Sequence, residues 1–341
     1  MQTDYFLDSL SSPHTRELYS FHLQRFNNWS FQNKGEDSQK QIIGYLMEMK
    51  REGLSYAYRS NAVCAIRHYY EMDDILLNWK KISRFLGEVK SDNEIRGYTH
   101  EEIEKLLSFS NFKHRAVILT LASTGMRREA LAQIRTSDIE YLEQHQLYKI
   151  KIYRKTQSEQ ICFTTPEAAK EIQQYLKIRD SLRQDNSLFQ YDNAVSVSVV
   201  LRKLALRSRV GQIHHEAEGD RHGQFRDSIP AAHGLRKFCI TQMSKAKMDT
   251  EIAKLLTGHS IGVRGRYLNY SEDDLLQEYL KAIDLLTINE TNRLRKKVDI
   301  LKEKEDEIKT LKERLNSYES QTMELKVQVD ELLRIYRLQK K

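Results

Sequence analysis

The chain has 341 residues, of which 40% are hydrophobic and 30% charged, and it contains only 3 prolines. This composition excludes collagen-like, disordered low-complexity and disulfide-stapled proteins, and it favours helices because proline is the main helix breaker. The 55 Lys and Arg residues exceed the 48 Asp and Glu residues, which gives a formal net charge of +7. A positive excess of this size is compatible with a polyanionic partner but does not identify one.

Residues 1–92 predict a compact bundle of about four short helices. Ser12 followed by Pro13 is typical of a helix start, because serine caps free backbone amides and proline fits the first turn. Apolar residues then recur three and four positions apart, as on the buried face of a helix. These residues are Tyr19, Leu23 and Phe26, then Ile42, Ile43, Leu46 and Met47, then Ala62, Val63, Ile66, Tyr69 and Tyr70, and finally Ile82, Phe85 and Leu86. The charged segment 89–96 lacks apolar periodicity and predicts a linker.

Residues 93–288 predict a second domain that is mainly helical with a small β-sheet (an α+β domain). Thr99 and Glu102 have the spacing of a capping box and predict the start of its first helix. The apolar stretch 116–122 predicts a buried helix that ends at Gly125.

A change in the spacing of apolar residues indicates where the sheet lies. Between residues 148 and 165, apolar residues alternate with charged ones on either side of a polar turn, which predicts a two-stranded hairpin. Pro166 begins a further helix. Segment 194–206 alternates like a strand, but its continuation suits a helix better, and the polar segment 208–230 predicts a loop.

The tail, residues 291–338, predicts a coiled coil. Its apolar or tolerated residues recur at alternating intervals of four and three over about six heptads, with one slip after Ile308. They are Leu294, Val298, Leu301, Glu305, Ile308, Leu311, Leu315, Tyr318, Thr322, Leu325, Val329, Leu332 and Tyr336. The alternative is a single solvated helix that folds back on its own domain, and we favour self-association.

The 3 cysteines are far apart and lack the spacing of zinc or redox motifs, which predicts a reducing compartment. No signal peptide is recognisable, and no apolar stretch approaches the length of about 18 residues that a membrane helix needs. We therefore expect a cytoplasmic protein without a membrane partner.

Residues that could take part in catalysis or binding occur in four separated pieces of the sequence, and none of these pieces is a glycine-rich nucleotide loop. Arg127 follows Gly125 at a turn between two predicted helices, a position that presents a side chain to a ligand. Lys155 lies at the turn of the predicted hairpin, from which it could reach a phosphate. His233 and Arg236 are three residues apart, so they share a helix face and could bind a phosphate and handle its proton.

The fourth piece is His259 in Thr-Gly-His-Ser, followed by Tyr267 and Tyr270. Each piece alone is explained more simply by a solvated side chain or a helix cap. Their common order and spacing, however, are specific.

In that order, these residues resemble the catalytic set of the tyrosine recombinases, the phage-type integrases. The resemblance covers roughly residues 5–288 and is strongest to archaeal integrase-like members, in Leu121–Leu131 and Gly258–Ile288. It implies an N-terminal core-binding domain that contacts DNA, a catalytic domain, and a site-specific recombinase that needs neither metal nor other cofactor. It also implies double-stranded DNA as partner and four protomers acting on two sites, with helix 272–286 able to dock on a neighbour.

The resemblance implies a role for each residue. Arg127 and Arg236 would clamp the phosphate, His233 would accept or orient a proton, and His259 would hydrogen-bond the phosphate. Lys155 would protonate the leaving oxygen, and Tyr267 would be the nucleophile that forms a 3′-phosphotyrosine link.

Two positions depart from the family pattern. The position three after Arg127, usually acidic, is Ala130, and Glu129 lies one residue earlier. The interval from His259 to Tyr267 is one residue shorter than usual, so Tyr270 remains a rival nucleophile. Two alternatives therefore stay open: a topoisomerase IB-like or junction-resolving strand transferase that uses the same residues, or a DNA-binding coiled-coil scaffold with a decayed site.

Overall fold

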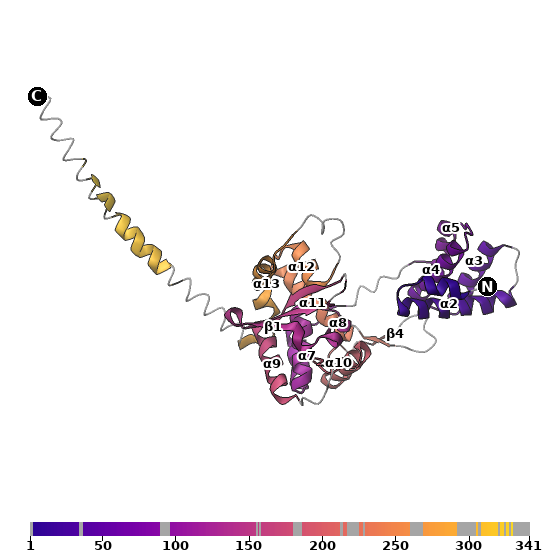
Figure 1. Cartoon of the computed structure of the whole chain (residues 1–341), viewed down its shortest axis with the longest axis horizontal. Helices are drawn as coiled ribbons and strands as arrows, with labels where there is room; N and C mark the ends of the chain where they lie inside the picture. Colours follow the sequence, from indigo (N-terminus) through magenta and orange to yellow (C-terminus); the bar gives the residue numbers. More distant parts are fainter. Residues whose placement is uncertain are drawn as a thin grey trace, which may run out of the picture. The chain divides into compact units, whose positions relative to one another are not determined.

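The chain divides into two compact units, residues 1–95 with 212–228 and residues 96–211 with 229–341, each described by itself (Figure 1). The computed structural model describes residues 3–33, 37–88, 96–154, 156, 158–179, 186–211, 214–216, 225–227, 229–259, 269–291, 305, 308–319, 321–323, 325–326 and 329.

Residues 3–88 of the first unit form a bundle of five α-helices and a short 3₁₀ turn. The elements are α1 (Thr3–Ser9), α2 (Pro13–Gln32), α3 (Ser38–Arg51), α4 (Tyr56–Met72), α5 (Trp79–Ser83) and the turn Arg84–Leu86. The Ser12 hydroxyl accepts from the Thr15 amide at 3.4 Å, so the predicted cap of α2 is confirmed. Helix α1 was not predicted, because it is short and begins without a capping signal.

Apolar side chains from all the helices of this unit form its core. Phe26, Ile42, Leu46, Ile66 and Ile82 are at most 1% exposed, as their helical spacing predicts. Their burial supplies the main stabilising free energy of the bundle.

Between residues 96 and 291, the described part of the second unit contains eight α-helices and a small sheet. The helices are α6 (His100–Ser108), α7 (Phe112–Thr124), α8 (Arg128–Gln133), α9 (Pro166–Ile178), α10 (Ala194–Ser208), α11 (Ala231–Lys245), α12 (Thr250–Thr257) and α13 (Glu272–Leu286). Of these helices, α7, α9, α12 and α13 pack against the sheet. Thr99 and Glu102 form the predicted capping box of α6. All residues of α7 from Ala116 to Thr124 are buried, and α7 packs against α9 and α11, so it is the central helix of this unit.

The sheet has three antiparallel strands in the order β1 (Ile139–Leu142), β2 (Leu147–Ile152) and β3 (Gln160–Phe163). Strands β2 and β3 are the predicted hairpin, with Ile150 opposite Cys162. Strand β1 was missed because it is a short edge strand whose residues are all at least partly exposed.

Of two further predictions, the structure confirms one and contradicts part of the other. Segment 194–206 lies in helix α10, as its continuation favoured. The prediction of a loop over 208–230 is wrong in part, since β4 (His214–Glu216) and β5 (Phe225–Asp227) pair antiparallel. Backbone hydrogen bonds form this pair without an apolar alternation that sequence reasoning could have recognised.

Helix α13 packs within its own unit. Tyr279, Ala282, Ile283 and Leu286 are at most 1% exposed, and α13 lies against α7, α11 and α12. The apolar face of this helix is therefore buried in its own unit, and docking of helix 272–286 on a neighbouring subunit stays a prediction.

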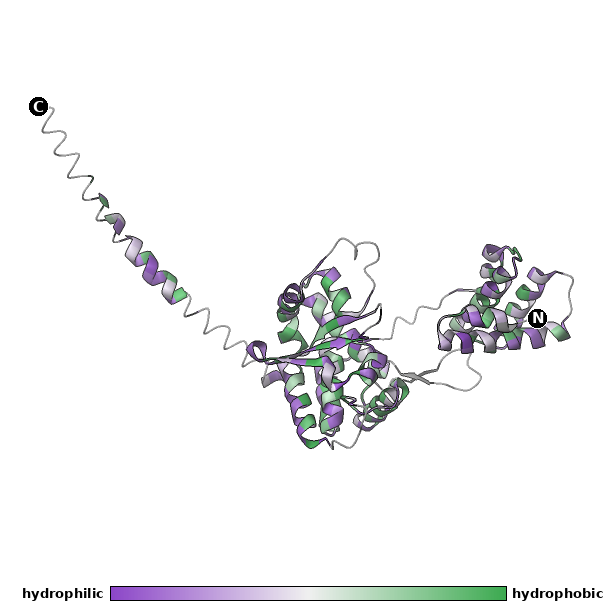
Figure 2. Cartoon of the chain, in the orientation of Figure 1, coloured by the Kyte–Doolittle hydropathy of each residue, from purple (hydrophilic) through white to green (hydrophobic). Residues whose placement is uncertain are grey.

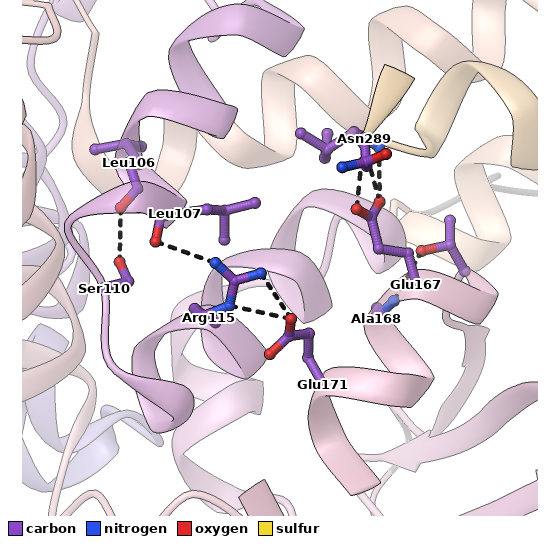
Figure 3. A network of polar contacts seen from close by, with 10 residues as sticks. Leu106, Leu107, Ser110, Arg115, Glu167, Ala168, Glu171 and Asn289 are labelled. Atoms are coloured by element: carbon purple, nitrogen blue, oxygen red, sulfur yellow. Dashed lines mark hydrogen bonds and ion pairs between the residues drawn. The ribbon is translucent and has the colours of Figure 1, made fainter. Parts of the chain in front are cut away.

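A network of polar contacts fixes the end of α13 to the rest of the unit (Figure 3). Glu167, in the first turn of α9, accepts from the backbone amides of Ile288 at 2.8 Å and Asn289 at 3.2 Å. Arg115 on α7 donates to Glu171 on α9 at 2.7 Å. These bonds tie the segment after α13 to α9, and α9 to the central helix.

Residues 308–319 of the tail are helical. Ile308, Leu311, Leu315 and Tyr318 are 52–66% exposed, and hydrophobic and hydrophilic residues are mixed along this helix in Figure 2. Much of the predicted seam, including Leu294, Val298, Leu301, Leu332 and Tyr336, lies outside the described residues. None of the helices in the described part of the chain combines the length and apolar character needed to cross a membrane.

Candidate active site

Arg236, on helix α11, lies at the centre of the candidate site. It is only 5% exposed, and one of its guanidinium nitrogens (Nη1) donates to the carbonyl oxygens of Gly125 and Thr257, each at 2.5 Å. These carbonyls lie at the C-terminal ends of α7 and α12, where helix carbonyls lack partners within the helix and the helix dipole is negative. Two helix ends that converge from distant parts of the sequence thus stabilise one buried cation.

Glycines make this convergence possible. Gly125 and Gly258 end α7 and α12 in the left-handed conformation, with φ of +62° and +73°. A Cβ atom would lie 3.0 Å from the Cys239 sulfur at Gly125 and 2.3 Å from the Gln160 side-chain oxygen at Gly258. Both the backbone conformation and the close approach therefore favour glycine.

Arg127 joins Arg236 at the end of α12. It is the N-cap residue of α8, its side chain is exposed, and its Nη1 donates to the Gly258 carbonyl at 2.8 Å. Burial, and then the like charge of Arg127, lowers the pKa of Arg236. Within the described residues, the hydrogen bonds of Arg236 go to carbonyls and an imidazole, and none goes to a carboxylate. Such a cationic pair, held by neutral groups, is suited to bind an anion.

His259 completes the polar contacts of Arg236. The Arg236 Nη2 lies 3.1 Å from the His259 Nε2, and the His259 Nδ1 lies 3.0 Å from the Thr257 hydroxyl. The same Nη2 also lies 3.4 Å from the His259 Nδ1, so the guanidinium contacts both ring nitrogens. Burial, and then the charges of Arg236, Arg127 and Lys254, lower the pKa of His259, which favours the neutral ring near pH 7.

His233 lies one turn before Arg236 on α11, and its side chain is exposed. Partial burial, and then the charges of Lys237 and Arg236, lowers the pKa of His233 from its ordinary value of 6.5. The ring is therefore neutral near pH 7 and able to accept a proton.

Tyr153, just past the end of β2, is a site residue that sequence reasoning missed. It lies near Arg127, Glu129 and Arg236, and burial raises the pKa of its phenol. Tyr153 also lines a cavity of about 650 Å³ together with Ala130 and Arg154. One tyrosine next to a predicted turn carries no periodic signal, so only the three-dimensional arrangement identifies it.

Two of the predicted site residues, Lys155 and Tyr267, lie outside the described residues. Arg127, Arg236 and His259 are brought together, and His233 lies close enough to Arg236 for its pKa to be affected.

The rival tyrosine, Tyr270, has acidic neighbours, unlike the cationic Arg127 and Arg236. Burial, and then the negative charges of Asp249, Glu251, Asp274 and Glu278, raises its pKa. Acidic neighbours disfavour both a phenolate and an approaching phosphate.

Of the two departures from the family pattern, the one at Ala130 and Glu129 lies within the described residues, and the interval from His259 to Tyr267 does not. Ala130 is 1% exposed and lines the same cavity as Tyr153. Glu129 is paired with Arg128 at 2.8 Å. The acidic group near Arg127 therefore comes from the preceding residue and is already engaged with a second arginine.

Comparisons with known proteins agree on one family and one fold. The sequence matches the phage integrase family over residues 97–271, just over half of the chain. The fold is similar to that of the XerH site-specific recombinase bound to palindromic difH substrate in a post-cleavage complex, with a TM-score of 0.56 and 18% identity over 84% of this chain and 80% of that one. It is also similar to the Tn1549 transposon integrase in complex with circular intermediate DNA, with a TM-score of 0.53 and 17% identity over 79% of this chain and 94% of that one. Among curated proteins, no sequence match is found.

Proposed function

The chain belongs to the phage integrase family of tyrosine-type site-specific DNA recombinases, and we propose that Arg127, Arg236, His233 and His259 form the phosphate site at which it cleaves and rejoins duplex DNA. The observation that carries this proposal is the buried Arg236, bonded to carbonyls and an imidazole next to a second arginine. Burying a cation without a carboxylate partner costs stability, so a protein has reason to retain it where an anion must bind.

The arginines act on the transition state. Attack on a phosphodiester passes through a pentacoordinate phosphorus whose non-bridging oxygens gain negative charge. Arg127 and Arg236 stabilise these oxygens by charge-assisted hydrogen bonds from positions that are fixed before the substrate arrives. By analogy with lost oxyanion donors, removing either guanidinium slows cleavage by roughly 10²–10³-fold.

Tyr267 is the proposed nucleophile. Its phenolic oxygen forms a bond to phosphorus, the bond from phosphorus to the 5′-oxygen breaks, and a 3′-phosphotyrosine link results. His233 accepts the phenol proton, and Lys155 gives a proton to the leaving 5′-oxygen. The reverse steps reseal a strand. The covalent link retains the energy of the broken bond, so ATP is not consumed, and the cationic side chains supply the charge that a metal would otherwise provide.

Two arguments favour Tyr267 over Tyr270. The sequence interval from His259 matches the family better for Tyr267. In addition, the charged neighbours of Tyr270 named above are acidic rather than cationic.

The domain assignment follows from the family. Residues 1–92 are proposed to be a helical DNA-binding domain, residues 93–288 the catalytic domain and residues 291–338 a coiled coil that joins protomers. The first two would clamp duplex DNA within a tetramer, and binding should weaken steeply with salt because phosphate contacts dominate its affinity. Within the family we propose an affinity to archaeal integrase-like members, and action in the cytoplasm.

A covalent-trapping experiment tests the proposed function. Duplexes recovered from a random pool by binding to the Tyr267→Phe chain are nicked beside the cleavage point, so that resealing is prevented. In EDTA, the natural chain and Tyr270→Phe should form a covalent DNA adduct, and Tyr267→Phe should not.

Three results would contradict this expectation in different ways. Loss of the adduct only in Tyr270→Phe would reverse the choice of nucleophile. An adduct that requires Mg²⁺ would contradict the metal-free scheme, and no adduct from any chain would indicate a decayed DNA-binding scaffold. Relaxation of supercoiled DNA without exchange between two sites would instead indicate the topoisomerase-like alternative.

A further inference from the structure

We propose that Lys50, Arg59 and Gly87 form a second phosphate-binding site, which takes a backbone phosphate of duplex DNA away from the point of cleavage. The inference rests on the DNA binding proposed for residues 1–92. It goes beyond the candidate active site, because all three residues belong to the bundle of the first unit. A buried arginine, the conformation of one glycine and the position of one lysine lead to it together.

Arg59, on helix α4, is held in the same manner as Arg236. It is 9% exposed, its Nε and Nη2 donate to the Leu86 carbonyl at 3.3 and 2.9 Å, and its Nη1 donates to the Leu54 carbonyl. Within residues 3–33 and 37–88, these bonds leave a second N–H group on Nη1 and on Nη2 for another acceptor. A buried guanidinium that is bonded to neutral carbonyls keeps its positive charge for an anion.

Gly87 lies beside this guanidinium, at the end of the 3₁₀ turn Arg84–Leu86. Its φ of +82° and ψ of −170° form a combination that is essentially restricted to glycine. A Cβ atom at Gly87 would lie 3.7 Å from the Arg59 Nη2 and 3.7 Å from the Lys50 Nζ. A guanidinium nitrogen and an ammonium nitrogen therefore border the same space, which the absent side chain of Gly87 leaves open.

Lys50 lies in the last turn of α3, and its side chain is exposed. The carboxylates nearby in the sequence are engaged with arginines: Glu48 pairs with Arg51 at 2.8 Å, and Glu52 pairs with Arg25. In the described part of the first unit, no ion pair of Lys50 itself is found. An ammonium and a guanidinium at one space repel each other, and an anion that accepts from both removes this repulsion.

The chemistry of this site fits a phosphodiester. Its non-bridging oxygens can accept from the guanidinium and the ammonium at once, and each of these hydrogen bonds is charge-assisted. The site offers cations and no group that distinguishes one base from another. It should therefore position the first unit on DNA without reading the sequence.

The salt dependence of binding tests this contact. DNA binding is measured with the full chain that carries Tyr267→Phe, so that no strand is cleaved. Adding Lys50→Gln should reduce the slope of log Kd against log salt concentration by about 0.9, the loss of one phosphate contact, and Lys50→Arg should retain the slope. All chains should keep the same melting temperature. A lower melting temperature with an unchanged slope would show that Lys50 only complements the dipole of α3, and would overturn the inference.

A methylphosphonate scan locates the contact. Single phosphates away from the cleavage point are replaced one at a time by a neutral methylphosphonate. At one position, the replacement should weaken binding by the starting chain but not by Lys50→Gln. Lys40→Gln is the matched control, because Lys40 is an exposed lysine near the other end of the same helix, and it should remain sensitive at that position. If Lys50→Gln still senses every phosphate that the starting chain senses, the inference is wrong.

The covalent-trapping experiment distinguishes this inference from the proposed function. A natural chain that forms the adduct, without any phosphate contact that depends on Lys50, would overturn the inference alone. A contact that depends on Lys50 in a chain that never forms an adduct would support the inference and contradict the proposed cleavage. A chain that binds no duplex would contradict both.

Discussion

Arg236 illustrates how a single residue can combine a structural and a chemical role. Its guanidinium pairs with carbonyls at the ends of two helices and also contacts His259. Without this side chain, the Gly125 and Thr257 carbonyls would lose a donor, and a buried acceptor without a partner costs about 1–3 kcal/mol. Stability and cleavage are thus expected to be coupled at Arg236, whereas the exposed His233 allows the chemistry to be probed separately.

The pH dependence of cleavage tests the role of His233. As a proton acceptor it must be neutral, and burial together with Lys237 and Arg236 lowers its pKa below 6.5. The neutral fraction therefore stays dominant as the pH falls to about 6.5 and decreases only below it. The rate of adduct formation should be nearly constant down to that pH and then decline.

Two histidine variants identify the group that causes this decline. His233→Gln should be slower by roughly 10²–10⁴-fold and should lose the acid decline. His259→Gln should keep the decline, because His259 bonds the phosphate in the proposed scheme and does not accept the proton. A decline that disappears only in His259→Gln would exchange the two roles.

At the scale of elements, the site depends on where helices end. Helices α7 and α12 end at left-handed glycines, and α13 supports the end of α7 because the Tyr279 hydroxyl donates to the Ser123 carbonyl at 3.0 Å. Positions of backbone carbonyls, more than side chains alone, therefore set the distance between the two arginines.

Gly258→Ala tests this dependence. An alanine at a φ of +73° is strained by roughly 1–2 kcal/mol, and its Cβ would displace the Gln160 side chain. We expect a lower melting temperature and slower adduct formation, since the carbonyl that holds Arg127 must shift. Adding Gln160→Ala removes the side-chain clash but not the backbone strain, so the double variant should remain impaired. If the double variant regained the natural melting temperature and the natural rate of adduct formation, the clash with the Gln160 side chain, and not the backbone strain, would be the cause of the impairment.

Some of the helices and strands could be predicted from the sequence, and others could not. Helix α7 and its end at Gly125, the caps of α2 and α6 and the β2–β3 hairpin follow from local patterns, and each is confirmed. Strands β1, β4 and β5 were missed because short strands with little apolar alternation lack such a pattern.

The candidate site was predictable only in part. Arginine and histidine side chains can be recognised from motifs in order along the chain. Main-chain carbonyls cannot, because every residue has one, and only the folded chain brings Tyr153 to the same cavity as Ala130.

For the whole molecule, the proposed coiled-coil tail is the segment through which we expect protomers to meet. Residues 291–341 contain 14 basic and 10 acidic residues, and the described apolar side chains of the tail helix are exposed. With the apolar face of α13 buried in its own unit, the tail offers a separate apolar surface for a second copy of this chain. Pairing of such surfaces buries the apolar seam.

Sedimentation measurements test this self-association. The full chain should sediment as a dimer or larger oligomer without DNA, and Leu311→Asp with Leu315→Asp should shift it to a monomer because charges would be buried in the seam. Glu313→Lys, which lies on the opposite side of the predicted heptads, should leave the oligomer intact. A monomeric natural chain would instead favour a single helix that does not pair.

The most direct test of the account is to identify the atom that becomes attached to DNA. The trapped adduct is digested with protease and nuclease, and the peptide that carries the nucleotide is sequenced by mass spectrometry. The account predicts a 3′-nucleotide on the phenolic oxygen of Tyr267, with the yield greatly reduced in Arg236→Gln. A nucleotide on Tyr270, or on a serine, or a natural yield in Arg236→Gln, would contradict it.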